Sequence, residues 1–124
     1  MIKIEIPNPD VVLTKKKQLG EKVEAAISSE YGFTDYHRIP RDKGGIILLF
    51  NAEDELLYVG KARKLRPRVK KHFEDTASAI KKHRDEVYKV AVSIVDDPME
   101  REIYETYIIN KLHAKYNIDK VFYK

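Results

Sequence analysis

A single carboxylate, Glu105, interrupts an otherwise apolar helical pattern near the end of the chain. It precedes Ile108, Ile109 and Leu112 by three, four and seven residues, so in a helix it shares their face. Desolvating an unpaired carboxylate is costly, and such a group usually has a cationic partner or a metal ion. The pattern therefore predicts either a salt bridge, with an Arg as the expected partner, or a metal site at Glu105.

A basic run at residues 61–71 is the second feature that could do chemistry. Seven of its eleven residues are Lys or Arg and none is acidic. Residues 1–60 carry 8 Lys and Arg against 10 Asp and Glu, whereas residues 61–124 carry 16 against 10. Contiguous cations can bind phosphates by releasing condensed counterions. The run predicts either a surface for nucleic acid or a solvated basic helix face.

Composition limits the class of protein. A chain of 124 residues, 43% hydrophobic and 35% charged, suits one compact domain. The absence of cysteine excludes disulfides, zinc-thiolate sites and thiol nucleophiles. No run approaches the roughly 20 apolar residues that cross a bilayer, and the amino terminus does not resemble a targeting sequence. We therefore expect a cytoplasmic protein without a membrane partner.

Hydrophobic periodicity predicts the strands. Residues 1–6 alternate and should form a short strand that Pro7 and Pro9 end, followed by a helix over residues 14–30. Residues 45–50 and 56–59 are apolar runs joined by a polar loop, which is typical of an antiparallel hairpin. Residues 88–95 alternate and predict a further strand. Residues 118–123 could pair with residues 1–6 or extend the sheet.

The sequence also predicts several helices. A helix is expected from residue 65 to about residue 74, with Pro67 in its first turn and both Val69 and Phe73 facing the core. A second helical piece is expected over residues 76–84. Asp97 can cap a helix that has Pro98 at its first position and runs to about His113. Apolar residues spread around most of this helix, which predicts cover on several sides: Met99, Ile103, Tyr104, Tyr107, Ile108, Ile109 and Leu112.

Three stretches together resemble a known family. GGIILLF, LYVGKARKLRPRVKKHF and EREIYETYIINKLHAKYN look like the GIY-YIG nuclease domain, most closely the amino-terminal nuclease module of excinuclease C, over residues 44–117. The resemblance implies an α+β fold with a small antiparallel three-stranded sheet flanked by helices. Residues 1–43 would be an amino-terminal extension, a strand and a helix packed on the core, and residues 44–124 the nuclease domain.

The resemblance assigns roles position by position. Tyr58 and Gly60 match the YIG element, and Lys61 matches the lysine that follows it. Arg68 matches the arginine of the first family helix, Glu105 the metal-binding glutamate, and Asn117 the asparagine that closes the module.

Two positions depart from the family pattern. Ile47 stands where GIY has its tyrosine, and His72 stands where excinuclease C often has another tyrosine. Ile47 removes a hydrogen-bonding group from around the attacking water. Imidazole, in contrast, can still hydrogen-bond a phosphate or transfer a proton.

The resemblance implies a divalent-metal-dependent endonuclease. Glu105 would hold Mg²⁺ or Mn²⁺, Arg68 would donate paired hydrogen bonds to the phosphate, and Tyr58 would act as a base in the field of Lys61. His72 would assist with the phosphate or a proton. The remaining polar residues would contact substrate: Arg63, Lys64, Arg66, Lys70, Lys71 and Asn117.

The expected substrate is DNA, cut one strand at a time in repair or recombination, with RNA not excluded and a protein partner as a possible source of targeting. The loss of the GIY tyrosine leaves a second hypothesis open. In that alternative, the chain is a catalytically weak or inactive nucleic-acid-binding module on the same scaffold.

Overall fold

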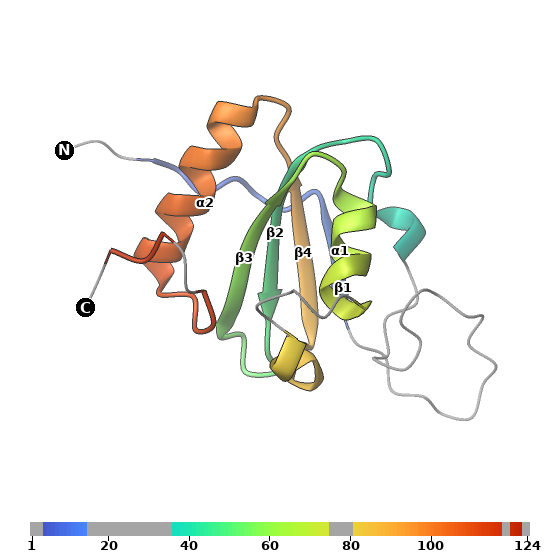
Figure 1. The fold of residues 1–124 in the computed structure, drawn as a ribbon, viewed down its shortest axis with the longest axis vertical. Coiled ribbons are helices and arrows are strands. Elements are labelled where there is room, and N and C mark those ends of the chain that lie inside the picture. The colour runs from blue at the N-terminus through green and yellow to red at the C-terminus, as the bar shows by residue number, and fades with distance from the viewer. Residues whose placement is uncertain (1–3, 15–35, 75–80, 118–119, 123–124) are drawn as a thin grey trace.

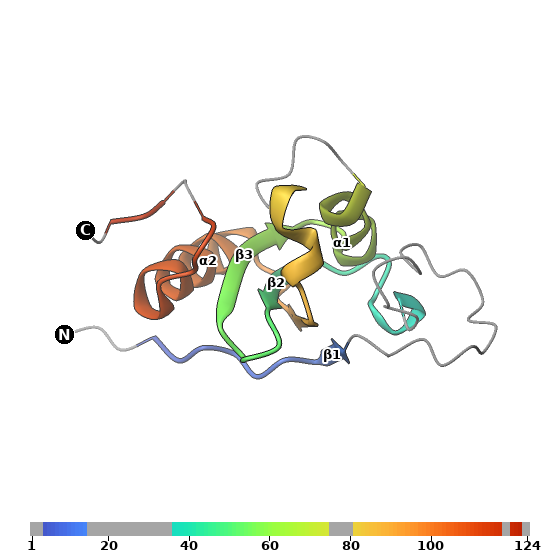
Figure 2. The ribbon, with the colours of Figure 1, turned by 90° about the horizontal axis from the view of Figure 1, so that it is seen from below.

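A computed structural model describes residues 4–14, 36–74, 81–117 and 120–122. These residues form one antiparallel sheet with α-helices on both faces (Figures 1 and 2). The strand order is β1-β4-β2-β3. The elements are β1 (Val11–Thr14), η2 (Tyr36–Arg38), β2 (Gly45–Phe50), β3 (Leu56–Ala62), α1 (Leu65–Glu74), η3 (Lys81–Glu86), β4 (Lys89–Ile94) and α2 (Pro98–Leu112).

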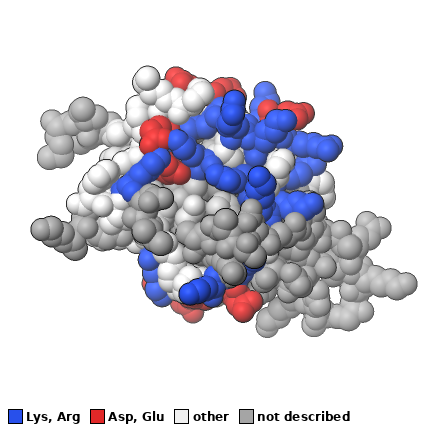
Figure 3. Space-filling model, viewed as in Figure 1, with Lys and Arg blue, Asp and Glu red and all other residues white. Residues whose placement is uncertain are grey.

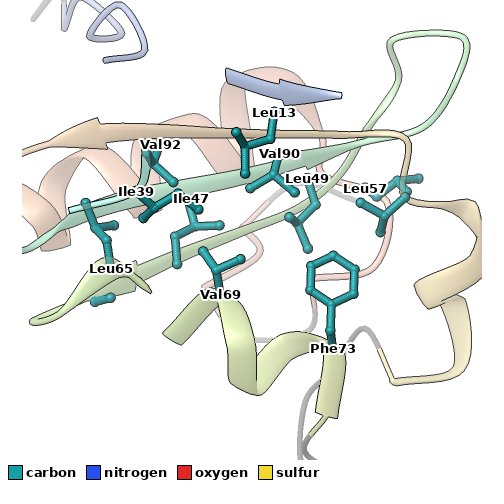
Figure 4. Packing of buried hydrophobic residues seen from close by; sticks show 12 residues of the cluster. Leu13, Ile39, Ile47, Leu49, Leu57, Leu65, Val69, Phe73, Val90 and Val92 are labelled. Atoms are coloured by element: carbon teal, nitrogen blue, oxygen red, sulfur yellow. The ribbon is translucent and has the colours of Figure 1, made fainter. Parts of the chain in front are cut away.

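The sheet separates two apolar layers. The first lies under α1, where Val69 and Phe73 point at the sheet beside Ile47 and Leu49, as Figure 4 shows. The second lies under α2 and contains Ile108 together with other buried residues. Strand β2 lies between β4 and β3 and is buried on both faces, which explains why its sequence is continuously apolar rather than alternating. The predicted α+β class is confirmed.

A bulge in β3 decides which side chains share a face. Leu49 pairs with Tyr58, but the next residue, Phe50, pairs with Leu56, so Leu57 is an extra residue in its strand. Beyond the bulge, Tyr58 lies on the α1 side of the sheet. Lys61 pairs with Ile46, which belongs to the layer under α2, so Lys61 lies on that opposite side.

Gly45 begins β2 where it pairs with β4. A Cβ atom at this position would overlap the backbone carbonyl oxygen of Ser93, which cannot move without breaking the sheet. At Gly60, a Cβ atom would instead meet the ring edge of Tyr58 at 3.1 Å, and a side chain can shift. The glycine at the start of the GIY element is therefore required by strand packing.

Replacing Gly45 with Ala is expected to lower the free energy of unfolding by about 3 kcal/mol because the added methyl group overpacks a rigid contact. The matched change Gly60→Ala is expected to cost about 1 kcal/mol. Urea denaturation of both variants measures the difference. Equal losses in the two variants would contradict this account of Gly45.

Both predicted helix starts are confirmed. Helix α1 spans Leu65–Glu74 as expected, and the Asp97 side chain caps α2 by accepting a hydrogen bond from the Met99 amide at 2.9 Å. The expectation that α2 is covered on several sides is wrong within the described part of the chain. Met99 is 70% exposed and both Ile103 and Leu112 are also exposed, because only one face of α2 packs on the sheet.

The extra amino-terminal strand lies at a different place from the prediction. Residues 4–6 are outside any strand, and β1 follows Pro7 and Pro9 instead of preceding them. The Asp10 amide donates to the Val92 carbonyl at 2.8 Å, and β1 then pairs with β4. Burial of Leu13 in the α1-side core supplies the reason, since the alternating isoleucines of residues 1–6 have no such partner strand at Ile4 and Ile6.

Three other expectations meet the structure only in part. The helix expected over residues 14–30 lies outside the described residues, except Thr14, which ends β1. Of the piece expected over residues 76–84, the described part is the 3-10 helix η3, which continues to Glu86. The pairing expected for residues 118–123 is wrong for residues 120–122, which form no strand. Among the described helices, none is long and apolar enough to cross a membrane.

Candidate active site

Two aromatic rings meet on the α1 side of β3. The rings of Tyr58 and His72 have their centroids 5.0 Å apart at an angle of 63°, an edge-on contact. His72 belongs to α1 and is buried, whereas Tyr58 is partly exposed. A Cβ atom on Gly60 would lie 3.5 Å from His72 Nε2 and 3.7 Å from the Tyr58 hydroxyl, so Gly60 lies beside both polar atoms.

A chain of four charges lies on the α2 side. Lys61 of β3 donates to Glu102, and Lys120 donates to the other carboxylate oxygen of Glu102. Lys120 also donates to Oε1 of Glu105 at 2.5 Å. Lys61 and Glu105 are thus connected through two residues that the sequence hypothesis did not include. The cationic partner of Glu105 is a Lys and not the expected Arg.

The four charged side chains that are linked on the α2 side stabilise one another. Hydrogen bonds from Lys120 and then Lys61 lower the pKa of Glu102 to about 2. Partial burial would lower the pKa of Lys120, but hydrogen bonds to Glu102 and Glu105 outweigh it and raise this pKa. Because the pKa of Glu102 is lower in the folded state, the stability that its ion pairs give to the fold is complete above about pH 4.5 and is lost as the pH falls toward 2.

Glu105 is much more deeply buried than Glu102. Its side chain is 11% exposed, whereas that of Glu102 is 45% exposed. It lies on α2 beside Ile108 and Ile109, on the face that packs against the sheet, as the helical spacing predicted. A carboxylate this buried needs a positive charge, and the Lys120 ammonium supplies it.

Most of the basic run is exposed on and just before α1. In Figure 3, Lys and Arg gather at the upper right, over the position of α1 in Figure 1. Arg68 is exposed and makes no ion pair with any other described residue. The exposed neighbours that share this surface are Arg63, Lys64, Lys70 and Lys71. Their substrate contacts stay predictions.

Arg66 differs from the rest of the run. Its guanidinium donates to the carbonyl of Ile39 at 2.8 Å and to that of His37 at 2.7 Å. These bonds fasten η2 and the residue that follows it to the first turn of α1. The described contacts therefore give Arg66 a positioning role, and its predicted contact with substrate is untested.

Asn117 closes the module by binding the edge of the sheet. Its side-chain oxygen accepts from the Val59 amide and its side-chain nitrogen donates to the Val59 carbonyl, both at 2.9 Å. The amides of Lys115 and Tyr116 donate to the carbonyls of Leu56 and Leu57. Because β3 is the last strand of the sheet, these bonds cover its otherwise open edge. Substrate contact by Asn117 stays a prediction.

The departure at Ile47 is a core position. Ile47 is fully buried in the α1-side layer and pairs with Gly60 across β2 and β3. It therefore lies on the same side of the sheet as Tyr58, where it supplies packing and no hydrogen-bonding group.

The carboxylates suit a hard divalent cation. Mg²⁺ prefers oxygen ligands and is often held by one or two carboxylates together with substrate phosphates. Glu105 and Glu102 lie three residues apart on α2, and the cationic Lys120 already contacts both of them. No larger group of His, Asp or Glu that could hold a metal occurs in residues 4–14, 36–74, 81–117 and 120–122. The donor set therefore fits a metal that shares its remaining ligands with water and substrate.

The sequence hypothesis did not include Glu102 and Lys120, and only Glu102 had a sequence feature that could have indicated its place in the site. Glu102 precedes Glu105 by three residues and so shares its helical face. Lys120 had no such signal, because it reaches the carboxylates from a turn whose shape depends on contacts with α2.

Comparison with known proteins establishes the family. The profile of the UvrC-like GIY-YIG domain matches residues 43–118, well over half of the chain. The chain therefore belongs to the UvrC-like GIY-YIG family of nuclease-type domains.

Two relatives show how the similarity is distributed. The chain is 66% identical over 124 residues to the Uncharacterized protein YurQ of Bacillus subtilis (strain 168), covering both chains completely. It is 40% identical over 80 residues to the UvrABC system protein C of Clostridium tetani, a match that covers 62% of this chain but only 13% of that protein. The chain thus corresponds to a small part of UvrC.

Solved structures agree with the fold. The GIY-YIG N-terminal endonuclease domain of UvrC from Thermotoga maritima, bound to its catalytic magnesium, superposes with a TM-score of 0.57 at 23% identity. The match covers 64% of this chain and 88% of that one. At this identity the likeness confirms the GIY-YIG fold and leaves the chemistry to the residues of the site.

Proposed function

We propose that the protein is a metal-dependent endonuclease that hydrolyses phosphodiester bonds in DNA. The observation that carries this proposal is the carboxylate of Glu105, buried on α2 although an apolar residue would pack there more cheaply. Strand β3 lies between α2 and α1 (Figure 2) and carries Tyr58, while α1 carries Arg68 and His72. A protein that only binds DNA gains nothing from a carboxylate, because carboxylates repel phosphate.

Each residue has a distinct part in the proposed reaction. Glu105, with Glu102 beside it, holds the cation, which when bound polarises a phosphate oxygen and lowers the pKa of water. Arg68 donates paired hydrogen bonds to the phosphate and stabilises the charge that develops on it. Tyr58 accepts the proton of the attacking water as its phenolate, which the cations of the site would have to stabilise, and its contact with His72 orients the ring.

Lys61 acts mainly through its charge in this proposal. Its ammonium is paired with Glu102, so it holds that carboxylate in place on the α2 side of the site. The exposed cations on α1 hold the DNA backbone. A single site of this kind cuts one strand, and Mg²⁺ and Mn²⁺ are the proposed cofactors.

The setting of the activity is also proposed. We propose that the protein acts in DNA repair or recombination in the cytoplasm, with a protein partner that directs the nuclease to its substrate. Residues 44–124 would form the nuclease domain and residues 1–43 an extension packed on it. The pairing of β1 with β4 supports that arrangement.

Metal removal tests the function directly. We expect the protein to convert supercoiled plasmid to the nicked circle with Mg²⁺ or Mn²⁺ and to stop completely when EDTA is added, because the proposed chemistry requires the cation. Gel mobility measured in parallel reports DNA binding, which should persist in EDTA. Nicking that continues in EDTA would exclude the metal-dependent mechanism.

A binding module without activity is the second candidate, and the burial of Ile47 favours it. The GIY tyrosine is replaced by a core residue, so one hydrogen-bonding group of the family site is missing. General acid-base groups contribute typically about 10²- to 10⁴-fold, so this loss slows an enzyme without necessarily stopping it. Salt-sensitive DNA binding with no nicking across metals and pH would support this candidate over the endonuclease.

A further inference from the structure

The contacts of Lys120 show a cation held in a specific place. Its backbone has a left-handed φ of 63°, which is uncommon for a residue with a side chain. Its ammonium contacts Oε1 of Glu102 and Oε1 of Glu105, and its side chain is 30% exposed. Among the described residues, Lys120 is the sole ion-pair partner of Glu105.

Asn110 of α2 holds this turn against the helix. Its side-chain nitrogen donates to the Lys120 carbonyl at 2.7 Å and to the Thr106 carbonyl at 2.8 Å. Its side-chain oxygen accepts from the Phe122 amide at 2.6 Å. One amide group thus binds both the carbonyl of Lys120 and the amide two residues further along the chain, so the position of the ammonium over the carboxylates is built into the fold.

We propose that Lys120 is an internal cation that competes with the divalent metal for Glu105, and that Asn110 determines how readily Lys120 leaves. The inference rests on the proposed function, since it concerns the same carboxylate. Without metal, Lys120 neutralises a carboxylate that is too buried to stay charged cheaply alone. With metal, the ammonium and the dication would meet at one oxygen and repel each other, so Lys120 must move away.

This competition determines the metal concentration at which the site fills. The free energy of the Lys120–Glu105 contact is subtracted from that of metal binding, so a firmly held Lys120 weakens the metal. Weakening either the contact of the Lys120 ammonium with Glu105 or the hydrogen bonds from Asn110 to the turn is expected to strengthen metal binding. Lys120 is therefore a residue that sets metal affinity, without being a ligand.

Titration with Mn²⁺, followed by the EPR signal of the free ion, measures the affinity without relying on catalysis. The comparison uses the full chain and the variants Lys120→Met, Asn110→Ala and Lys111→Met. Lys120→Met is expected to lower the Kd for Mn²⁺ about tenfold, since hydrogen bonds to charged groups are worth about 1.5 kcal/mol or more.

The other two variants separate competition from a general charge effect. Asn110→Ala keeps every charge but removes the two hydrogen bonds that hold the turn, and we expect it to lower the Kd about threefold. Lys111→Met removes an exposed charge from α2 and is expected to change the Kd by less than about twofold. Circular dichroism confirms that each variant is folded.

Each outcome bears on a distinct claim. Equal Kd values for the full chain and both Lys120→Met and Asn110→Ala would overturn the competition, as would an equal gain in Lys111→Met. In either case the proposed function stands if Glu105→Gln abolishes the bound Mn²⁺. If Glu105→Gln binds Mn²⁺ as tightly as the native chain, Glu105 is not the ligand, and both the competition and the metal-dependent function at this site fail.

Discussion

Replacing Glu105 with Gln is expected to slow metal-dependent nicking of supercoiled DNA by about 10³-fold. Metal stabilisation of transition-state charge is worth several kcal/mol, and each 1.4 kcal/mol is about a factor of ten. Gln keeps the size of the side chain and can still accept a hydrogen bond from Lys120, so the fold should survive. The initial rate of nicked-circle formation at saturating Mg²⁺ is the measurement.

Glu100→Gln is the matched control for this change. Glu100 lies in the first turn of the same helix, is exposed and has no contact with the charge chain in the described structure. Its replacement removes the same charge and should leave the rate within about twofold, as for an ordinary surface substitution. A Glu105→Gln protein that nicks DNA at the native rate would remove Glu105 from the mechanism.

Arg68→Ala is expected to lower the nicking rate by about 10²- to 10³-fold, the range found when one donor to a developing anion is removed. The loss should appear in kcat. Several cations on and before α1 are proposed to hold the DNA backbone, whereas Arg68 is the one assigned to the reacting phosphate. Arg68→Lys should recover only part of the rate, since an ammonium lacks the paired donors of a guanidinium. Single-turnover kinetics with DNA bound at low salt separates this effect from weaker binding.

Lys70→Ala provides the comparison on the same helix. Lys70 is exposed on α1, and losing one phosphate contact should reduce the salt slope of log affinity by about 0.9 while leaving the single-turnover rate near native. If Arg68→Ala changes only the salt slope, as Lys70→Ala does, Arg68 belongs to the binding surface and not to the chemistry.

Local signals in the sequence were sufficient for much of the fold. Helix α1 follows from its Val69 and Phe73 spacing with Pro67 in the first turn, and α2 from Asp97 and Pro98. These features act within one or two turns, so their effect does not depend on the rest of the molecule. The first strand was misplaced because residues 1–6 alternate whereas Val11–Thr14 do not, and only the pairing with β4 makes the latter the strand.

In the candidate site, too, the features set by local sequence were predicted, whereas those set by contacts between distant segments were not. The helical spacing of Glu105 predicted a desolvated carboxylate, and the structure confirms one. The cationic partner of Glu105 was expected to be an Arg but is Lys120. Lys120 reaches Glu105 from a turn that Asn110 holds by a hydrogen bond, and such a contact between separate segments has no local sequence signal. Asn117 and Arg66 bind backbone groups far along the chain, which the sequence did not reveal, and their contacts with substrate stay predictions.

The sequence by itself determined the residue types available for chemistry, the face of α2 that carries Glu105 and the basic character of α1. Only the tertiary structure decided which of these groups meet. The register of β3 against β2 places Tyr58 on the α1 side with His72, and Lys61 on the α2 side with Glu102. Strand register depends on burying both faces of β2 at once, and that long-range condition cannot be found in any single stretch of residues.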